Sequence, residues 1–427
     1  MTPYLLIPFV FLVLAFIFRM PLGFGMLVGS VLYFLATGRS LGNVLNSACY
    51  GLFSSYILIA IPLFIFTANI MNSSAVTNKI YNFANALIGR VRGGTGHVNV
   101  LGSLIFAGMT GSALADAAGI GVLEIKQMTE EGYDRAFSCA LTASSAVIGP
   151  IFPPSIPFVI YAVISGASIG KLFLGGMIPA FIIAGVLMAY VAYISGKRNY
   201  PRGVRTTFRE FVRDTVKATP ALLTPAVLLV GIYTGVMTPT EAAAVAALYA
   251  MIIAFFVYRT FKPADLVKVV KNTLRTTGSI FLVVMGAYVF SYIVAVEQVA
   301  PAVAKLLGDL TVSPFVFLVI VNILFLILGC FVDVNVSMLV FLPIIIPMLG
   351  VYHIDPVHFG VMICLNMMIG LVTPPFGMLL FLTSAIGKVP MKDLIREAAP
   401  MIGMLVVALA IITVFPQTVL FATRLIR

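Results

Sequence analysis

Residues 144–155 read SSAVIGPIFPPS and residues 366–375 read NMMIGLVTPP, and each stretch places two adjacent prolines in an otherwise apolar segment. Two consecutive prolines remove two backbone N–H donors and clash with the preceding turn, so a helix must unwind there. In a segment that crosses a bilayer, the freed carbonyl oxygens are tolerated only where protein, a cavity or an ion satisfies them. A hard cation such as Na⁺ prefers oxygen ligands. The two interruptions therefore predict a binding site for an ion or a solute. A pair of kinks satisfied by Ser and Thr hydroxyls is the alternative.

The composition places these segments in a membrane. Of 427 residues, 61% are apolar and 10% are charged, and the mean hydropathy is +1.11. Such a chain has too little polar surface to coat a soluble protein of this size. The run from Tyr4 to Phe18 has no Lys or Arg before it, so we interpret it as a retained span and not as a signal peptide. We predict an all-α polytopic membrane protein with crossings at about residues 3–18, 21–37, 50–71, 134–165, 172–195, 220–237, 240–258, 276–296, 357–386 and 399–421.

An internal repeat appears when 221 is added to residue numbers in the first half of the chain, because the same residue type recurs in the second half. Many of the recurring residues are Pro or Gly, which have special backbone roles, so the matches indicate a duplication. The matching pairs are Gly108/Gly329, Ile148/Ile369, Gly149/Gly370, Pro153/Pro374, Pro154/Pro375, Gly166/Gly387, Lys171/Lys392 and Pro179/Pro400.

The repeat predicts the domain organisation. Apolar stretches at 97–126 and 315–349 are interrupted by GMTGSALAD and GCFVDVNVS, which predicts a re-entrant hairpin in each copy. Each copy then holds about five crossings plus one hairpin, and because five is odd the second copy is inverted. Two inverted halves can open one central site to either side in turn, so alternating access follows. The predicted parts are a first repeat (1–196, broken helix 134–165), a cytoplasmic basic amphipathic linker (197–219) and a second repeat (220–427, broken helix 357–386).

The net charge of +11 indicates membrane orientation, and no nucleic-acid partner is expected, because the basic residues fall in the loops between apolar runs. Ten crossings with the N-terminus outside leave few of the 26 Lys and Arg residues on the outer side: Arg39, Lys171, Lys305, Arg424 and Arg427. In the linker, Arg205, Arg209, Arg213 and Lys217 recur every four residues. This spacing predicts a basic amphipathic helix at the cytoplasmic surface, and a solvated linker that only anchors topology is the alternative.

Several acidic residues need separate interpretation. Thr238 and Glu241, three residues apart with a proline between them, predict a capping box at a helix start. Glu124 is expected near the cytoplasmic exit of the first hairpin. The hairpin tips place Ser112 and Asp116, then Asp333 and Ser337, four residues apart in opposite order, and the 221 offset pairs each Asp with a Ser.

A carboxylate at bilayer depth costs about 2.5–3.5 kcal/mol, so the two tip aspartates predict contact with an ion or a solute. Helix N-capping by Asp or Ser is the alternative for both tips, although a cap and a ligand are compatible. Helices that begin at the tips would also point positive dipole ends at an anionic solute.

Other chemistry is not favoured. The sequence has no GxxxxGK[ST] motif for ATP hydrolysis and no HExxH motif. His97, His353 and His358 lie at the edges of loops or spans, and the four cysteines show no paired spacing, so neither a metal cluster nor an enzyme is predicted. A channel and a proton-coupled carrier with Asp116 and Asp333 as relay groups remain rival interpretations.

The motifs GMTGSALAD, SSAVIGPIFPPS, FVDVNVS and NMMIGLVTPPFG, in this order and over essentially the whole chain, resemble the large membrane subunit of tripartite ATP-independent periplasmic (TRAP) transporters of the C4-dicarboxylate and sialic acid type. The resemblance implies a bacterial inner-membrane protein of the ion-transporter superfamily. It implies an elevator mechanism, in which a transport core of two hairpins and two broken helices slides against a scaffold. It also implies Na⁺ as the coupling ion, a separate small membrane subunit, a periplasmic solute-binding protein and a carboxylate-containing solute such as sialic acid or a C4-dicarboxylate.

The same resemblance implies specific site residues. A first Na⁺ site would use two hydroxyls and three positions of the first interruption: Ser103, Ser145, Val147, Gly149 and Pro150. A second Na⁺ site would use the second tip and the second interruption: Val332, Asn366, Gly370 and Thr373. Solute is expected between the tips, near Thr110, Ser112, Asp116, Pro154, Asp333, Asn335, Ser337 and Pro375. The alternative is a proton-coupled organic-anion carrier that works without a binding protein.

Overall fold

The computed structural model describes residues 3–18, 20–74, 76–203, 207–299, 301–303 and 313–424. Within these ranges the chain forms helices and no β-strand, and eight helices are long and apolar enough to cross a membrane. Arg205 of the predicted basic helix lies outside the described ranges, as do Lys305 and Arg427 of the predicted outer side. In chain order the helices are η1 (Pro3–Leu5), α1 (Leu6–Ile17), α2 (Leu22–Ala36), α3 (Gly42–Phe53), η2 (Tyr56–Ile59), α4 (Ala60–Ser73), α5 (Val76–Ile88), α6 (Gly94–Thr110), α7 (Ala113–Ala118), α8 (Ile120–Glu130), α9 (Arg135–Ser145), η3 (Ala146–Ile148), α10 (Ile156–Ser165), α11 (Ile169–Lys197), α12 (Phe208–Tyr233), α13 (Pro239–Ile252), η4 (Ile253–Val257), α14 (Pro263–Val296), α16 (Pro314–Phe331), α17 (Val334–Val351), α18 (Pro356–Gly370), α19 (Met378–Gly387), α20 (Met391–Val414) and α21 (Gln417–Thr423).

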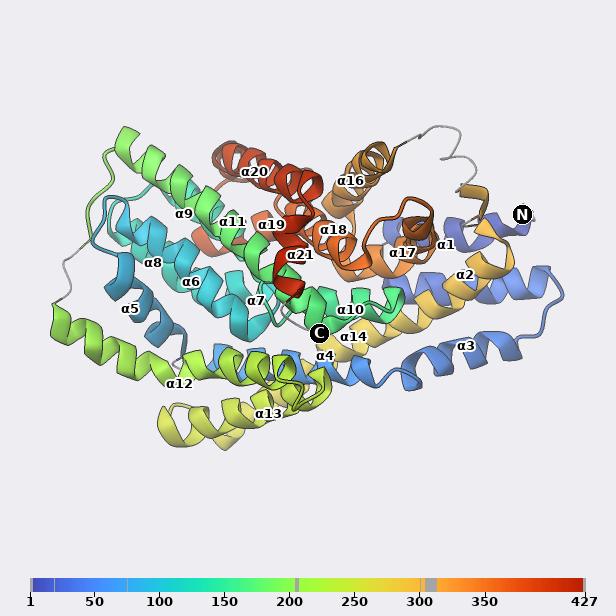
Figure 1. Ribbon diagram of the computed structural model, residues 1–427, viewed down its shortest axis with the longest axis horizontal. Coiled ribbons are helices and arrows are strands. Elements are labelled where there is room, and N and C mark those ends of the chain that lie inside the picture. Colours follow the sequence, from blue (N-terminus) through green and yellow to red (C-terminus); the bar gives the residue numbers. More distant parts are fainter. Residues whose placement is uncertain are drawn as a thin grey trace.

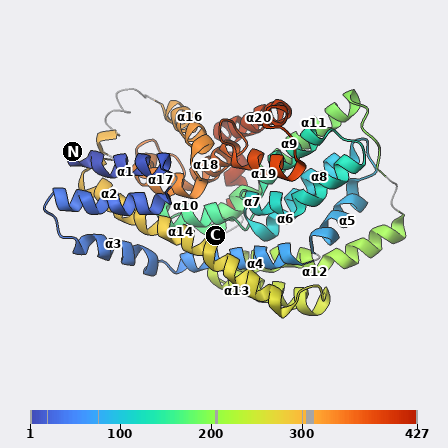
Figure 2. The ribbon, with the colours of Figure 1, turned by 180° about the vertical axis from the view of Figure 1, so that it is seen from behind.

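Helices α3, α12 and α13 lie along one long side of the molecule, and α11, α16 and α20 lie along the other (Figures 1 and 2). Helices α1 to α4 and α12 to α14 pack on one another, and we call them the scaffold group. Helices α6 to α11 and α16 to α20 form the core group. In the scaffold group, α2 and α14 cross with their backbones in contact. A β-carbon at Gly23 would lie 2.6 Å from the carbonyl oxygen of Leu282, and one at Gly286 would lie 2.9 Å from that of Gly23. Small residues at a membrane helix crossing permit this approach.

Two predicted crossings have different boundaries in the structure. The span predicted at 50–71 is divided into α3, η2 and α4, and the span predicted to begin at 276 is the second part of the 34-residue helix α14. The 221 offset carries the start of α3, Gly42, onto the start of α14, Pro263. At 1.5 Å per residue, α14 is roughly 50 Å long and exceeds the hydrocarbon layer by about 20 Å. The prediction began this span at residue 276 because hydropathy excludes the charged first turns of α14. Charged residues are nevertheless compatible with a helix outside the hydrocarbon layer.

The linker also differs from its prediction. Helix α12 begins inside it, at Phe208, and continues through Pro220 into the crossing, so the predicted boundary at 219 is not the end of a helix. A capping box fixes its start, because Glu210 Oε2 accepts from Thr207 N at 2.8 Å and Thr207 Oγ1 accepts from Glu210 N at 3.3 Å. The predicted capping box of Thr238 and Glu241 at the start of α13 is confirmed.

Helices end and restart near the positions predicted for the hairpin tips and for the two helix interruptions. The first hairpin turns between α6 and α7, and the second between α16 and α17. Residues 149–155 separate η3 from α10, and residues 371–377 separate α18 from α19. The halves also pack across the repeats: α9 packs on α19, where a β-carbon at Gly387 would lie 2.1 Å from Cys139 Sγ, and α10 packs on α18, where one at Gly360 would lie 2.4 Å from Tyr161 Cε1. Adding 221 to the residue numbers of α9 gives those of α18, and adding 221 to those of α10 gives those of α19. The offset therefore maps each of these two helix pairs onto the other.

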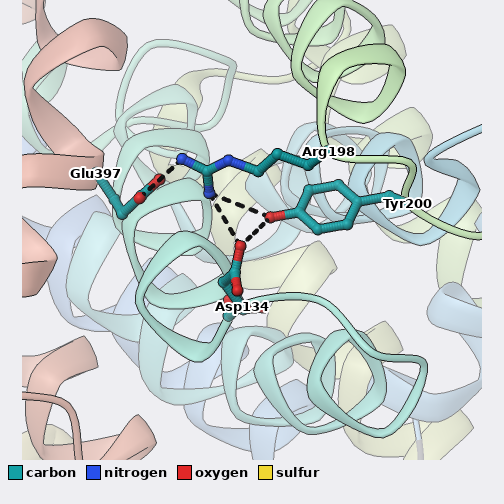
Figure 3. Close-up of polar contacts among 5 residues, drawn as sticks. Asp134, Arg198, Tyr200 and Glu397 are labelled. Atoms are coloured by element: carbon teal, nitrogen blue, oxygen red, sulfur yellow. Dashed lines mark hydrogen bonds and ion pairs between the residues drawn. The ribbon is translucent and has the colours of Figure 1, made fainter.

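A polar cluster joins the two halves of the chain near the ends of three core helices (Figure 3). Arg198, at the end of α11, contacts Asp134 Oδ2 at 3.1 Å and Glu397 Oε1 at 2.9 Å, and Tyr200 Oη donates to Asp134 Oδ2 at 2.7 Å. The hydrogen bond to Glu397 raises the pKa of Arg198, and burial raises the pKa of Tyr200. The arginine therefore stays charged and links α9, α11 and α20.

Replacing this arginine is expected to lower stability. The side chains of Arg198, Asp134 and Glu397 are 31%, 62% and 18% exposed, so the pairs are partly screened and together contribute about 1 kcal/mol or slightly more. We predict that Arg198→Gln lowers the melting temperature of the purified protein by about 2–4 °C. The neighbouring substitution Lys197→Gln serves as the control, and equal melting temperatures for the two variants would contradict a structural role for the cluster.

Candidate functional site

A cavity of about 1060 Å³ lies between the hairpin tips and the scaffold helices α2, α4 and α14. The core side contributes residues 110–115 of the first tip, 333–336 of the second tip and several positions of the interruptions, namely Pro150, Ile156, Pro157, Met368 and Leu371. The two broken helices and the two tips, which are far apart in sequence, therefore meet at one place.

The first tip packs backbone to backbone against the first interruption. Gly111 has φ +58°, and a β-carbon there would lie 2.4 Å from the carbonyl oxygen of Pro154. This position combines a positive φ with a close backbone approach, so it requires glycine. The next residue, Ser112, caps α7, and its hydroxyl accepts from Ala115 N at 3.4 Å. Ser112 therefore acts as a helix cap and also lines the cavity.

The second tip also begins with a helix cap, with an aspartate in place of the serine. Asp333 caps α17, and its Oδ1 accepts from Asn335 N at 2.9 Å. It lines the same cavity. Behind the tip, α16 and α18 meet at two glycines, since a β-carbon at Gly370 would lie 2.4 Å from the carbonyl carbon of Gly329. The capping alternative is thus present at both tips, and neither cap removes its residue from the cavity wall.

The hydroxyls predicted for a first ion site lie together. Ser103 Oγ donates to Ser145 Oγ at 3.1 Å, Ser145 Oγ is 2.8 Å from Asn99 Oδ1, and Asn99 Nδ2 donates to Thr142 Oγ1 at 2.7 Å. All four side chains are buried. This group connects α6 of the hairpin to α9 of the broken helix.

The backbone of the first interruption offers carbonyl oxygens without donors. Among the described residues, no hydrogen bond reaches the carbonyl oxygens of Val147, Gly149 or Pro150. Proline removes the donor four residues later for two of them, Pro153 for Gly149 and Pro154 for Pro150, whereas the corresponding donor for Val147, Ile151 N, donates to Ile148 O at 3.0 Å instead. An unsatisfied buried carbonyl costs about 1–3 kcal/mol, so these oxygens suit a cation.

The second interruption is more fully hydrogen-bonded. The carbonyl oxygen of Gly370 accepts from Thr373 N at 3.1 Å, and Thr373 Oγ1 donates to Ile369 O at 2.7 Å. Carbonyl oxygens without a donor in the described part of the chain remain at Val332 and Thr373. Among the residues predicted for the second Na⁺ site, Gly370 therefore has the carbonyl oxygen that is least available to a cation.

Asn366 matches Ser145 in both position and contacts. Its Nδ2 donates to Asn322 O at 2.8 Å and to Asn322 Oδ1 at 2.7 Å, and its own Oδ1 is buried without a partner among the described residues. The 221 offset carries Ser145 onto Asn366. In each half of the chain, a polar contact thus joins the hairpin to the broken helix, and Asn366 Oδ1 remains available.

The predicted solute residues separate into two sets. Thr110, Ser112, Asp333 and Asn335 line the cavity. Asp116, Ser337, Pro154 and Pro375 do not line it.

Asp116 does not line the cavity between the tips. It is 1% exposed and lies beside Ser103, because it sits one helical turn, about 6 Å, deeper than the tip. Glu124, which was expected near the cytoplasmic exit of the first hairpin, is also buried. It is 1% exposed and turned toward α6, where a β-carbon at Gly102 would lie 2.5 Å from Glu124 Oε1. The carboxylate oxygens of both residues have no hydrogen-bond partner among the described residues.

Arg275 on α14 also lines the cavity, and sequence reasoning missed it. The span was predicted to begin at 276, one residue after it. The signal that would have found it is the 221 offset, which extends this helix back to Pro263 once α3 and α4 are matched to it.

Comparison with known proteins agrees with this architecture. The family model described as the DctM component of the tripartite ATP-independent periplasmic transporters matches residues 9–418. The chain is 41% identical over 406 residues to the sialic acid TRAP transporter large permease protein SiaM of Vibrio cholerae, covering 95% of each. It is 40% identical over 417 residues to the sialic acid TRAP transporter permease protein SiaT of Haemophilus influenzae, covering 98% of this chain and 68% of the relative.

More distant similarities agree as well. The chain is 36% identical over 361 residues to the C4-dicarboxylate TRAP transporter large permease protein DctM of Pseudomonas aeruginosa, covering 84% of each. Among solved structures, the YdaH transporter of Alcanivorax borkumensis superposes with a TM-score of 0.64 at 14% identity, over 88% of this chain and 86% of that one. At this identity the similarity concerns the fold alone.

The close approach of Gly329 and Gly370 gives a test of the second tip. A methyl group at residue 370 would overlap the α16 backbone, so we predict that Gly370→Ala destabilises the protein by about 1–3 kcal/mol and lowers its melting temperature in detergent. The control is Gly403→Ala on α20, where the added β-carbon meets no atom within 4 Å. A Gly370→Ala protein as stable as the Gly403→Ala protein would show that this contact is not as tight as described.

Proposed function

Since the chain belongs to the DctM component of the TRAP transporters, a family of transport proteins and not of enzymes, we propose that it carries an organic acid into the cell by Na⁺-coupled secondary active transport. The observation that carries the proposal is the meeting of two interrupted helices, with carbonyl oxygens that lack donors, at a cavity lined by both hairpin tips. Such oxygens at membrane depth need a cation or an equivalent partner.

We assign the first Na⁺ to the buried group around Ser103 and Ser145, together with the carbonyl oxygens of Val147, Gly149 and Pro150. The observed contact between the two hydroxyls and the absence of donors to the three carbonyls support this assignment. We assign the second Na⁺ to Asn366 Oδ1 and the carbonyl oxygens of Val332 and Thr373, with Gly370 as a weaker candidate. Bound Na⁺ would hold each tip against its broken helix and so shape the solute cavity.

The solute is proposed to be an acid that binds between the tips, at Thr110, Ser112, Asp333 and Asn335. Relatives of this chain are named as permeases for sialic acid and C4-dicarboxylate. Sialic acid is the first candidate, because the two sialic acid permeases share 41% and 40% identity with this chain. The N-terminus of α17 faces the cavity and offers backbone dipoles to an anion.

The proposed transporter contains further parts. Two inverted repeats would exchange roles, and the matching contacts of α9 with α19 and of α10 with α18 support this symmetry. The core group would slide against the scaffold group as an elevator. A separate small membrane subunit and a periplasmic binding protein are expected, and the N-terminus is placed on the periplasmic side of the bacterial inner membrane.

A proton-coupled carrier that works without a binding protein is the second candidate. It is favoured by Asp116 and Glu124, two buried carboxylates in the first hairpin whose oxygens have no hydrogen-bond partner in the described part of the chain. Buried carboxylates of this kind occur in proton relays. The two candidates differ in whether uptake follows a Na⁺ gradient or a proton gradient.

Uptake by vesicles tests the proposal directly. With both membrane subunits reconstituted and a binding protein loaded with sialic acid or a C4-dicarboxylate outside, we predict uptake that follows an inward Na⁺ gradient and requires the binding protein. The expected reason is that Na⁺ binding forms the solute cavity. Uptake that follows a pH gradient, ignores Na⁺ and proceeds without the binding protein would favour the proton-coupled carrier.

Removing one proposed ligand tests the first ion site. We predict that Ser145→Ala raises the Na⁺ concentration required for half-maximal uptake severalfold, because one oxygen ligand and its contact with Asn99 are lost. Ser138→Ala is the matched control on the same helix, because the Ser138 hydroxyl donates to the carbonyl oxygen of Asp134, four residues earlier, and is not a proposed Na⁺ ligand. An identical Na⁺ dependence in the two variants would remove Ser145 from the site.

A further inference from the structure

Arg275 occupies an unusual position for a basic residue of this chain. It lies on α14 of the scaffold group, 12 residues or about 18 Å from the start of the helix, and it lines the cavity that the tips line from the other side. Among the described residues that form the cavity wall, Arg275 is the only cation and Asp333 is the only carboxylate.

The two charges are not used in the same way. Asp333 caps α17 and accepts from Asn335 N. Arg275 forms no ion pair with any described residue. Arg275 is an exposed residue that lines the cavity, so it is available to a ligand there. A carboxylate that enters the cavity would be repelled by Asp333 and attracted by Arg275.

We propose that Arg275 binds the acidic group of the solute from the scaffold side, while the hairpin tips bind the remainder of the molecule. The guanidinium presents paired N–H donors in a planar fork, which matches a carboxylate in two parallel hydrogen bonds. This inference rests on the proposed function and adds to it a residue that selects anionic solutes. It also places the recognition of charge outside the core group.

The placement has a consequence for transport. Because Arg275 belongs to the scaffold and the tips belong to the core, movement of the core relative to the scaffold separates the solute from Arg275. The contact therefore exists only while the cavity described here is formed. Arg275 therefore raises the affinity for the solute only in the state in which this cavity is formed. It affects the solute concentration that half-saturates uptake and not the Na⁺ sites, to which it makes no contact.

The test compares an acid with its uncharged ester. Competition of N-acetylneuraminate and of its methyl ester for uptake is measured in vesicles that contain the complete transporter with Arg275→Gln, Arg275→Lys or Lys271→Gln. Lys271 is the matched control, because it is an exposed cation one turn earlier on α14 that does not line the cavity. The Na⁺ concentration for half-maximal uptake is measured in parallel.

We expect Arg275→Gln to raise the half-saturating concentration of the acid about tenfold or more, as for loss of a charge-assisted hydrogen bond, and to leave that of the ester unchanged. Arg275→Lys should cause a smaller increase, and Lys271→Gln and the Na⁺ dependence should be unaffected. Equal changes for acid and ester, or wild-type affinity in Arg275→Gln, would overturn this inference and leave the proposed function intact. Wild-type vesicles without Na⁺-dependent uptake would contradict the proposed function, and this inference with it.

Discussion

A backbone carbonyl oxygen that loses its hydrogen-bond donor inside a bilayer has no water to replace that donor, and the cost is about 1–3 kcal/mol for each group. In this chain, prolines at 153 and 154 remove the donors that a continuous α-helix would supply to residues 149 and 150, and the carbonyl oxygen of Val147 also lacks a donor among the described residues. The hairpin tip packs against this interruption through Gly111, and Ser103 and Ser145 meet beside it. The geometry of the cavity follows from this local loss of hydrogen bonds.

The two interruptions are related by the 221 offset but are not equivalent. The first keeps three carbonyl oxygens without donors, whereas the second satisfies Gly370 with the amide of Thr373. The acidic residues are unequal too, since Asp333 lies at a tip and Asp116 lies a helical turn behind one. A binding site formed between unequal halves can hold an ion and an asymmetric solute at the same time. The scaffold completes it with α14, whose length brings a charged residue to the cavity wall.

Features set by local backbone chemistry were predictable from the sequence. The interruptions follow from adjacent prolines, the hairpins from small and polar residues within apolar runs, and the capping box at Thr238 from its spacing. The start of α14 at Pro263 was missed because charged turns outside the hydrocarbon carry no hydropathy signal. The burial of Asp116 and Glu124 was missed because it depends on how α7 and α8 rotate against α6, and the Gly102 contact that fixes this rotation is tertiary. Arg275 was missed for the same reason as the start of α14, because the predicted span began one residue after it.

The central claim is that a cation satisfies the carbonyl oxygens of the interruptions that lack hydrogen-bond donors. The most direct measurement is the melting temperature of the purified protein in detergent, without solute, as NaCl replaces choline chloride at constant ionic strength. A ligand that binds only the folded state stabilises it in a saturable manner. The account predicts a melting temperature that rises with Na⁺ and reaches a plateau. A melting temperature that is the same in Na⁺ and in choline at every concentration would contradict it.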